Sequence, residues 1–242
     1  MDTVSALVLF NAITFILSSI LIVMVWKNSR LSSRITFVMI QVLIIILVLA
    51  YTCDLLSPNI DEKMFWNNFE YLGLIYTPAL VLIISLQLSK WNAWLTRTRM
   101  LILLGAGTVF FVALVTNDYH HFFYLEMSLS ADPARSFQTQ RGPLFYIFFV
   151  WALAELLTAT FVAWFSNLTA GVAQRKRTKI LEFSFIAPAA MVILGMILEE
   201  WISSEVLVVT GIMISSVLLF VGTFGFEMFR RFRDAAIDRS LN

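Results

Sequence analysis

Two glutamates lie inside long apolar stretches of this sequence. Glu70 belongs to FWNNFEYLGLIYTP, residues 65–78, and Glu155 belongs to FVWALAELLTATF, residues 149–161. An acidic side chain at the centre of a membrane costs about 2.5–3.5 kcal/mol on insertion scales, and it usually faces a helix bundle interior or water. Each glutamate is therefore a candidate for ligand binding, for proton movement, or for a hydrogen bond between helices.

Glu70 is one member of a stripe with helical spacing. Asn67, Glu70, Gly73 and Thr77 recur at three- and four-residue steps, which places them on one face of a helix. The stripe is polar or small, so we expect it to face inward. Pro78 follows directly and removes a backbone hydrogen bond, which favours a bend. Two interpretations stay open: a polar wall of a pocket open to the outside, and hydrogen bonding between helices.

Glu155 lies deeper. It follows Pro143 by twelve residues, close to the expected midplane, and Trp151 and Thr158 share its helix face. No lysine, arginine or histidine occurs at that depth to pair with it. Low dielectric disfavours a lone charge. We therefore expect either a neutral carboxyl group that donates a hydrogen bond, or a counter-ion of a cationic ligand. A purely structural hydrogen bond is the alternative.

The elements that hold these residues are membrane helices. Of 242 residues, 60% are hydrophobic and 14% are charged, and the mean hydropathy is +0.84. A soluble domain has about 25% charged residues, so the composition indicates an integral membrane protein. Spanning needs about 20 apolar residues. Seven stretches qualify, at 4–26, 35–53, 65–89, 99–117, 143–167, 180–198 and 205–229. No linker separates a second domain.

The basic residues predict the orientation. Of the 17 lysines and arginines, only Lys63, Arg135 and Arg141 fall on one side of the expected spans. The other 14 fall on the opposite side: Lys27, Arg30, Arg34, Lys90, Arg97, Arg99, Arg175, Lys176, Arg177, Lys179, Arg230, Arg231, Arg233 and Arg239. Basic loops stay in the cytoplasm. We therefore expect a multi-pass protein of the plasma membrane, with its N-terminus outside and its C-terminus inside.

One connection, residues 118–142, is long. It contains the alternating stretches YLEMSLS and SFQTQ on either side of ADPAR, which predicts an extracellular β-hairpin between the fourth and fifth helices. An irregular loop is the alternative. The predicted fold is thus an all-α membrane protein, a seven-helix bundle over 1–229. Residues 230–242 are predicted to be a cytoplasmic juxtamembrane helix.

Several classes of protein are excluded by absent motifs. A single cysteine, Cys53, rules out an intrachain disulfide. The sequence has no P-loop, dinucleotide fingerprint, GxSxG or HExxH motif. His120 and His121 are adjacent and point apart on a helix, so we expect no metal site. We expect no cofactor and no nucleic-acid partner. The last span contains no lysine for a retinal Schiff base, which excludes a retinal protein.

Four segments resemble one family in the same order along the chain. WNNFEYLGLIYTP is similar to the third helix of the seven-helix N-terminal sensor region of prokaryotic membrane histidine kinases. TNDYHHFFY, residues 116–124, resembles the end of that family's fourth span, and RGPLFY, residues 141–146, resembles the start of its fifth. The tail FRRFRDAAIDRS resembles its exit toward a PAS or kinase domain.

The resemblance implies a receptor rather than an enzyme. In that family the seven-helix region is joined to a histidine kinase, PAS or diguanylate cyclase output. No phospho-acceptor box or ATP-binding motif occurs in this sequence, so we expect no kinase activity from it. The sequence departs from the family at EEWISSE, which lacks the usual Pro-Gly. It also departs at Trp151 and Glu155, where an uncharged, aromatic-rich helix is more usual.

We therefore expect a membrane sensor that detects an extracellular or membrane-borne small molecule and signals through its last helix. The expected partners are that ligand, the lipid bilayer, an output domain fused or separate, and a second copy of the chain. A transporter or channel for protons or small solutes, using Glu155 and Glu70, is the alternative. The expected ligand-binding residues are Asn67, Glu70, Thr77, Tyr146, Trp151 and Glu155, and the expected gating or structural residues are Gly73, Pro78 and Pro188.

Overall fold

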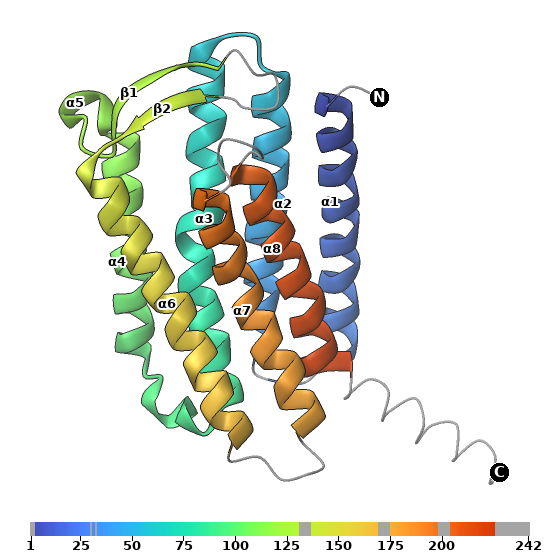
Figure 1. Ribbon diagram of the computed structural model, residues 1–242. Coiled ribbons are helices and arrows are strands. Elements are labelled where there is room, and N and C mark those ends of the chain that lie inside the picture. Colours follow the sequence, from blue (N-terminus) through green and yellow to red (C-terminus); the bar gives the residue numbers. More distant parts are fainter. Residues whose placement is uncertain are drawn as a thin grey trace, which may run out of the picture.

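Long helices, each antiparallel to the next long helix in the chain, make up most of the structure (Figure 1). The computed structural model describes residues 3–29, 31, 33–130, 137–168, 175–197 and 204–225. The long helices are α1 (Thr3–Asn28), α2 (Arg34–Leu56), α3 (Ile60–Leu88), α4 (Arg97–Val115), α6 (Pro143–Leu168), α7 (Arg175–Ile197) and α8 (Ser204–Phe220). Shorter elements are the 3-10 helix η1 (Lys90–Trp94), α5 (Asn117–His120) and the π-helical turn η3 (Val221–Gly225) that continues α8.

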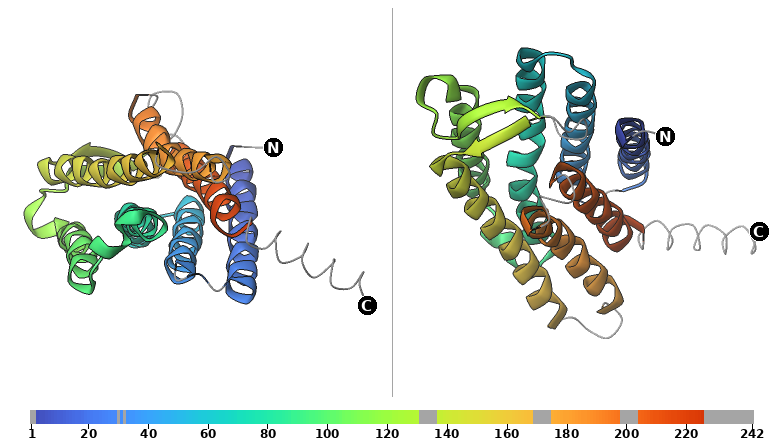
Figure 2. Two further views of the ribbon diagram at one scale, coloured as in Figure 1. Left: turned by 90° about the horizontal axis from the view of Figure 1, so that it is seen from below. Right: turned by 45° about the horizontal axis from the view of Figure 1, so that its top comes forward.

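The helices form two layers, as the view along the bundle shows (Figure 2). One layer is the row α4, α3, α2 and α1, and the other is α6, α7 and α8. Contacts join α3 to α6, and α8 to both α2 and α1. Because α3 lies between α2 and α4 and also packs on α6, it is more enclosed than α1, α2, α4 and α6, and 72% of its apolar segment is buried.

Local signals define where helices begin. The expected third span starts at Phe65, whereas α3 starts at Ile60. The side chain of Asn59 accepts a hydrogen bond from the backbone N–H of Glu62 at 2.9 Å, and so caps the helix. Asp61 and Glu62 favour its first turn because they oppose the helix dipole. Helix α6 begins with Pro143, whose fixed φ suits the first helical position.

Five helices within the described residues are long and apolar enough to cross a membrane: Val4–Asn28, Arg34–Leu56, Ile60–Leu88, Arg97–Val115 and Pro143–Ser166. A shorter apolar segment, Val209–Gly225, lies in α8 and η3. Helices α7 and α8 pack against each other within the same bundle. The expected sixth and seventh spans, 180–198 and 205–229, run into residues that lie outside the described part. The chain is therefore a multi-pass helical membrane protein.

Two antiparallel strands, β1 (Tyr124–Leu129) and β2 (Phe137–Arg141), lie across one end of the bundle, between α5 and α6 (Figure 1). Their register pairs Met127 with Thr139, with an irregularity between Tyr124 and Glu126. The expected turn, ADPAR at 131–135, lies outside the described residues. Gly142 follows the second strand, and a Cβ at this position would lie 2.2 Å from the carbonyl oxygen of Phe122, so only glycine fits.

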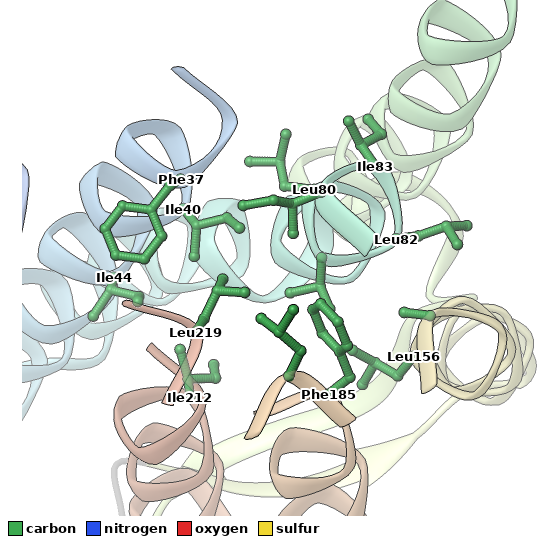
Figure 3. Close-up of a cluster of buried hydrophobic side chains, with 14 of the residues drawn as sticks. Phe37, Ile40, Ile44, Leu80, Leu82, Ile83, Leu156, Phe185, Ile212 and Leu219 are labelled. Carbon is green, nitrogen blue, oxygen red and sulfur yellow. The ribbon is translucent and has the colours of Figure 1, made fainter. Parts of the chain in front are cut away.

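Buried apolar side chains gather in two clusters. The first, called the main core here, draws on α1, α2, α3, α6, α7, α8 and η3, with side chains such as Ile40, Leu80, Leu156, Phe185 and Leu219 (Figure 3). The second, called the aromatic cluster, lies toward β1 and consists of Tyr71, Ile75, Phe110, Leu114, Phe123, Tyr124 and Phe148. These two clusters set the surroundings of the polar residues described next.

Candidate functional site

The predicted stripe on α3 lies on the buried side of that helix. Glu70 and Thr77 are only 6% and 4% exposed. Gly73 lies against α2, where an added Cβ would be 2.9 Å from the Cβ of Leu47. At about 100° per residue, Glu70 and Thr77 are displaced by about 60° and 40° from Gly73, toward the face that meets α6. The stripe therefore faces the interior, with Gly73 at the close contact between α2 and α3.

Proline occurs inside two of the helices. Pro78 in α3 and Pro188 in α7 are both buried, and both helices continue through them. A proline has no N–H, so the carbonyls four residues earlier, those of Leu74 and Ser184, lose their helical donor. Each helix thus has a backbone acceptor inside the bundle.

The aromatic cluster joins α3, α4, α6 and β1. The hydroxyls of Tyr71 and Tyr124 form a buried hydrogen bond. The ring of Phe148 lies 6.2 Å from that of Tyr71 and 5.6 Å from that of Phe110. Trp151 extends the cluster along α6, with its ring 5.2 Å from Phe110. The rings thus brace the strand-bearing end of the bundle.

Glu155 is buried where the two clusters meet. It is 5% exposed, and neither of its carboxylate oxygens has a hydrogen-bond partner within the described residues. One turn before it, Trp151 packs on the aromatic cluster, and the next residue, Leu156, belongs to the main core. It lies near the middle of the 26-residue helix α6. A carboxyl group thus sits at the centre of a membrane-length helix without a protein partner in the described structure.

The helical repeat gives the depth of Glu155 relative to α3, which runs in the same direction as α6 (Figure 1). Phe148 contacts Tyr71, and seven residues, or about two turns, further along brings α6 to Glu155 and α3 to Pro78. Both residues lie on the same faces as the contacting pair. Thr77 precedes Pro78, and its hydroxyl has no hydrogen-bond partner among the described residues. Glu155 and the hydroxyl of Thr77 therefore lie at a similar depth on two neighbouring helices.

Tyr146 lies apart from the other candidates. Its side chain is 50% exposed, and its ring contacts only Phe145 among the described aromatic residues. Asn67 is half-buried and lines a cleft next to β1. The structure thus brings Trp151 and Glu155 together on α6, and Glu70 and Thr77 together on α3, while Tyr146 points elsewhere. Within the described part of the chain, no three His, Cys, Asp or Glu side chains gather as a metal site.

Two buried polar residues that were not among the predicted site residues form hydrogen bonds between separate parts of the fold. Asn117 is buried, and its side-chain oxygen accepts hydrogen bonds from the backbone N–H groups of Phe123 and Tyr124, while its amide donates to the carbonyl of Tyr124. Gln41 is fully buried in α2 and donates to the hydroxyl of Ser216 in α8 at 2.9 Å. Asn117 stands in the TNDY motif, and Gln41 interrupts the apolar run VMIQVLIII, so each had a signal in the sequence.

Comparison with protein families gives a match over nearly the whole chain. Residues 10–231 match the family described as the N-terminal 7TM region of histidine kinase. No curated protein matches the chain. The family match covers the helical bundle, both strands and the α3 segment that contains Glu70. It also agrees with the resemblance carried by WNNFEYLGLIYTP, TNDYHHFFY and RGPLFY. The chain therefore belongs to the family of N-terminal seven-transmembrane regions of histidine kinases.

Proposed function

We propose that this chain is the sensor module of a signalling protein, detecting a small molecule from outside or from within the membrane. In this proposal seven helices cross the plasma membrane, with the N-terminus outside and the C-terminus in the cytoplasm. The signal passes to a histidine kinase or diguanylate cyclase output domain. The family is a sensor region rather than a catalytic domain, which supports a role in detection.

The observation that carries the proposal is the position of Glu155. A buried carboxyl group without a hydrogen-bond partner destabilises a fold by about 1–3 kcal/mol in mutational experiments. A protein keeps such a destabilising group where it serves ligand binding. Neither Glu155 oxygen has a hydrogen-bond partner among the described residues. The hydroxyl of Thr77 is a second such group at similar depth. We call these two groups, which lie at a similar depth on neighbouring helices, the polar pair, and we propose that they suit a ligand with a hydrogen-bond donor or a positive charge.

The other proposed ligand contacts lie between this pair and the end of the bundle that bears the strands. Trp151 borders Glu155 along α6, and Glu70 continues the polar side of α3 toward the end that bears the strands. Asn67 lies one turn further along at the cleft beside β1. Tyr146 is exposed, so its proposed contact is with a ligand arriving through the membrane.

Signal transfer is proposed to run through α7 and α8. Gly211 of α8 and Gly222 of η3 lie so close to α7 that an added Cβ would be 2.6 Å from Met191 and 2.9 Å from Leu181, respectively. A helix pair packed this closely moves as a unit, and Pro188 gives α7 a point of bending. A ligand shifts such an equilibrium only by its different affinity for the two states. The polar pair at Glu155 and Thr77 is proposed to provide that difference.

The experiment joins this chain to a histidine kinase output domain and measures autophosphorylation in liposomes. Glu155→Gln keeps the shape of the side chain but removes its acidity, and we expect it to change basal autophosphorylation severalfold. Glu126→Gln makes the same chemical change at an exposed position of β1 and should leave the rate unaltered. Equal rates for Glu155→Gln and the unsubstituted chain would contradict the proposal.

A transporter or channel for protons or small solutes is the second candidate, because a carboxyl group near the middle of the membrane is also the usual proton carrier of such proteins. Proteoliposomes loaded with a pH-sensitive dye separate the two functions. Proton flux that Glu155→Gln abolishes and Glu126→Gln preserves would establish transport. A sensor shows no flux above that of empty liposomes.

A further inference from the structure

A small cleft opens beside the strands, away from Glu155. It lies between the N-terminal part of α3, the α4–α5 junction and β1, and its volume is about 40 Å³. We call it the α3–β1 cleft. Its walls carry two thioethers, one tyrosine ring and the polar side chains of three elements, namely Met64, Asn67, Asn68, Asp118, Tyr124 and Met127.

Part of the polar lining is already used by the fold. The side-chain oxygen of Asn117 accepts hydrogen bonds from the N–H groups of Phe123 and Tyr124, and its amide donates one to the carbonyl of Tyr124. The hydroxyl of Tyr124 is bonded to that of Tyr71. These bonds hold one wall of the cleft in place before any ligand arrives.

Three polar side chains remain available. Asn67, Asn68 and Asp118 form no hydrogen bond or ion pair with any described residue. The neighbouring cation, Lys63, lies outside the lining, with its Nζ 3.6 Å from a carboxylate oxygen of Asp54 and 2.5 Å from its backbone carbonyl. The cleft is therefore lined by one carboxylate and two carboxamide groups that are not engaged by the described residues, and none of its lining residues carries a positive charge.

The volume limits the size of the guest. A buried water needs about 10–15 Å³ by the same kind of measure, so 40 Å³ holds roughly three atoms of that size. Pockets for drug-sized ligands are about 300–1,000 Å³. The cleft thus admits a head group of a few heavy atoms and excludes bulky ligands.

We propose that the α3–β1 cleft binds the ammonium group of a small organic cation. The N–H groups of the ammonium donate to Asp118 and to the carboxamide oxygens of Asn67 and Asn68. Its carbon substituents contact the thioethers of Met64 and Met127, and the Tyr124 ring attracts the charge through its face. The alternative occupant is a soft metal ion such as Ag⁺, which would bind to the thioether sulfurs of Met64 and Met127 rather than to the oxygen atoms.

This site shares Asn67 with the proposed sensor contacts, but it is separate from the carboxyl group of Glu155. It opens at the end of the bundle that bears the strands, and it joins α3 to β1, two elements that otherwise meet through the aromatic cluster. Binding there can be measured without any output domain, so its outcome is independent of the autophosphorylation experiment.

The test is binding to the purified full chain in nanodiscs, followed by calorimetry and by the intrinsic tryptophan fluorescence. The probes are methylammonium and ethylammonium, with methanol and ethanol as neutral partners of matched size and sodium chloride at equal ionic strength. We expect saturable binding of the ammonium probes alone. Equal binding of methanol, or no binding of either ammonium probe above the sodium chloride control, overturns the proposal.

The variants identify the groups involved. Asp118→Asn removes the charge at an exposed position and should weaken methylammonium binding roughly tenfold or more, since a charged hydrogen bond is lost. Glu126→Gln, which removes an exposed carboxylate on β1, should change affinity less than twofold. Met127→Leu keeps the volume and should preserve binding. Unchanged methylammonium affinity in Asp118→Asn contradicts the assignment. With Ag⁺ as a further probe, silver binding that Met127→Leu abolishes, together with no ammonium binding, also contradicts it.

Discussion

Single residues decide how closely the helices approach one another. Gly73 in α3 and Gly105 in α4 are both helical glycines, yet their surroundings are opposite. An added Cβ at Gly73 would lie 2.9 Å from the Cβ of Leu47 and 3.1 Å from the carbonyl of Leu43, whereas at Gly105 nothing lies within 4 Å. Sequence periodicity marks Gly73 as part of an inward stripe, but only the position of α2 explains why this member has no side chain.

The matched pair Gly73→Ala and Gly105→Ala tests this difference. Gly73→Ala forces α2 and α3 apart, and we expect it to lower the free energy of unfolding by about 1–3 kcal/mol. Gly105→Ala fills open space on a helix and should leave stability unchanged or raise it by up to about 1 kcal/mol. Thermal unfolding in detergent measures both. A similar loss in the two variants would show that the contact with α2 is not the cause.

Asn117 carries the second prediction for a single residue. Asn117→Leu removes three buried hydrogen bonds to the backbone of Phe123 and Tyr124, and we expect a loss of at least about 2 kcal/mol in stability. Asn117→Asp retains the acceptor and loses only the donor to Tyr124, so its loss should be smaller. Hydrogen exchange at the amides of Phe123 and Tyr124 provides the readout. Protected amides in Asn117→Leu would contradict this role.

Whole helices show how function and stability compete. Helix α6 buries Glu155 without a partner in the described structure, whereas α2 and α8 are joined by the hydrogen bond from Gln41 to Ser216. Both polar groups lie in apolar helices, and their sequences look alike in hydropathy. Their energetic effects are expected to be opposite, because the amide N–H of Gln41 has a partner, whereas neither Glu155 oxygen has one among the described residues.

We therefore predict that Glu155→Leu stabilises the bundle by about 1–3 kcal/mol, because it removes a buried polar group that lacks a partner. Ser216→Ala should destabilise it by about 0.5–2 kcal/mol, because it leaves the amide of Gln41 unsatisfied. Unfolding of both variants under one detergent condition tests the pair. A destabilised Glu155→Leu would indicate that the carboxyl group is structural.

Helix boundaries follow rules that hydropathy alone misses. The apolar pattern begins at Phe65, but α3 extends to Ile60 because Asn59 caps it and two acids favour its first turn. The expected fourth span, 99–117, is close to α4, and the residues after it turn into α5, where His121 has a left-handed backbone (φ 53°). The side chain of His120 accepts the N–H of Phe122, so the two histidines shape this turn.

The whole molecule has two chemically different ends. The end that bears β1 and β2 carries exposed acids such as Asp61, Glu62 and Glu126, while the opposite end carries Lys90, Arg97 and Arg99 with exposed tryptophans of η1 (Figure 1). Arg99 also lies over the ring of Trp94 at 4.5 Å. Such a basic, tryptophan-rich end suits the anionic inner leaflet.

Cysteine labelling tests the proposed orientation. In a Cys53→Ala background, Glu126→Cys on β1 should react with a membrane-impermeant maleimide on intact cells. Asn92→Cys in η1 should react only after the cells are permeabilised. Both positions are exposed, so accessibility within the fold does not limit either reaction. The reverse pattern would place the strands in the cytoplasm and refute the proposed topology.

The sequence by itself determined the class of the molecule, because hydropathy and the repeat of polar residues along a helix are local properties. It showed a membrane protein, an inward stripe around Glu70 on α3, and a deep carboxyl group at Glu155. Only the tertiary structure decided which groups meet. It placed Gly73 against α2, turned Tyr146 outward, and left Glu155 without a partner where two core clusters join, because such contacts depend on how separate helices pack.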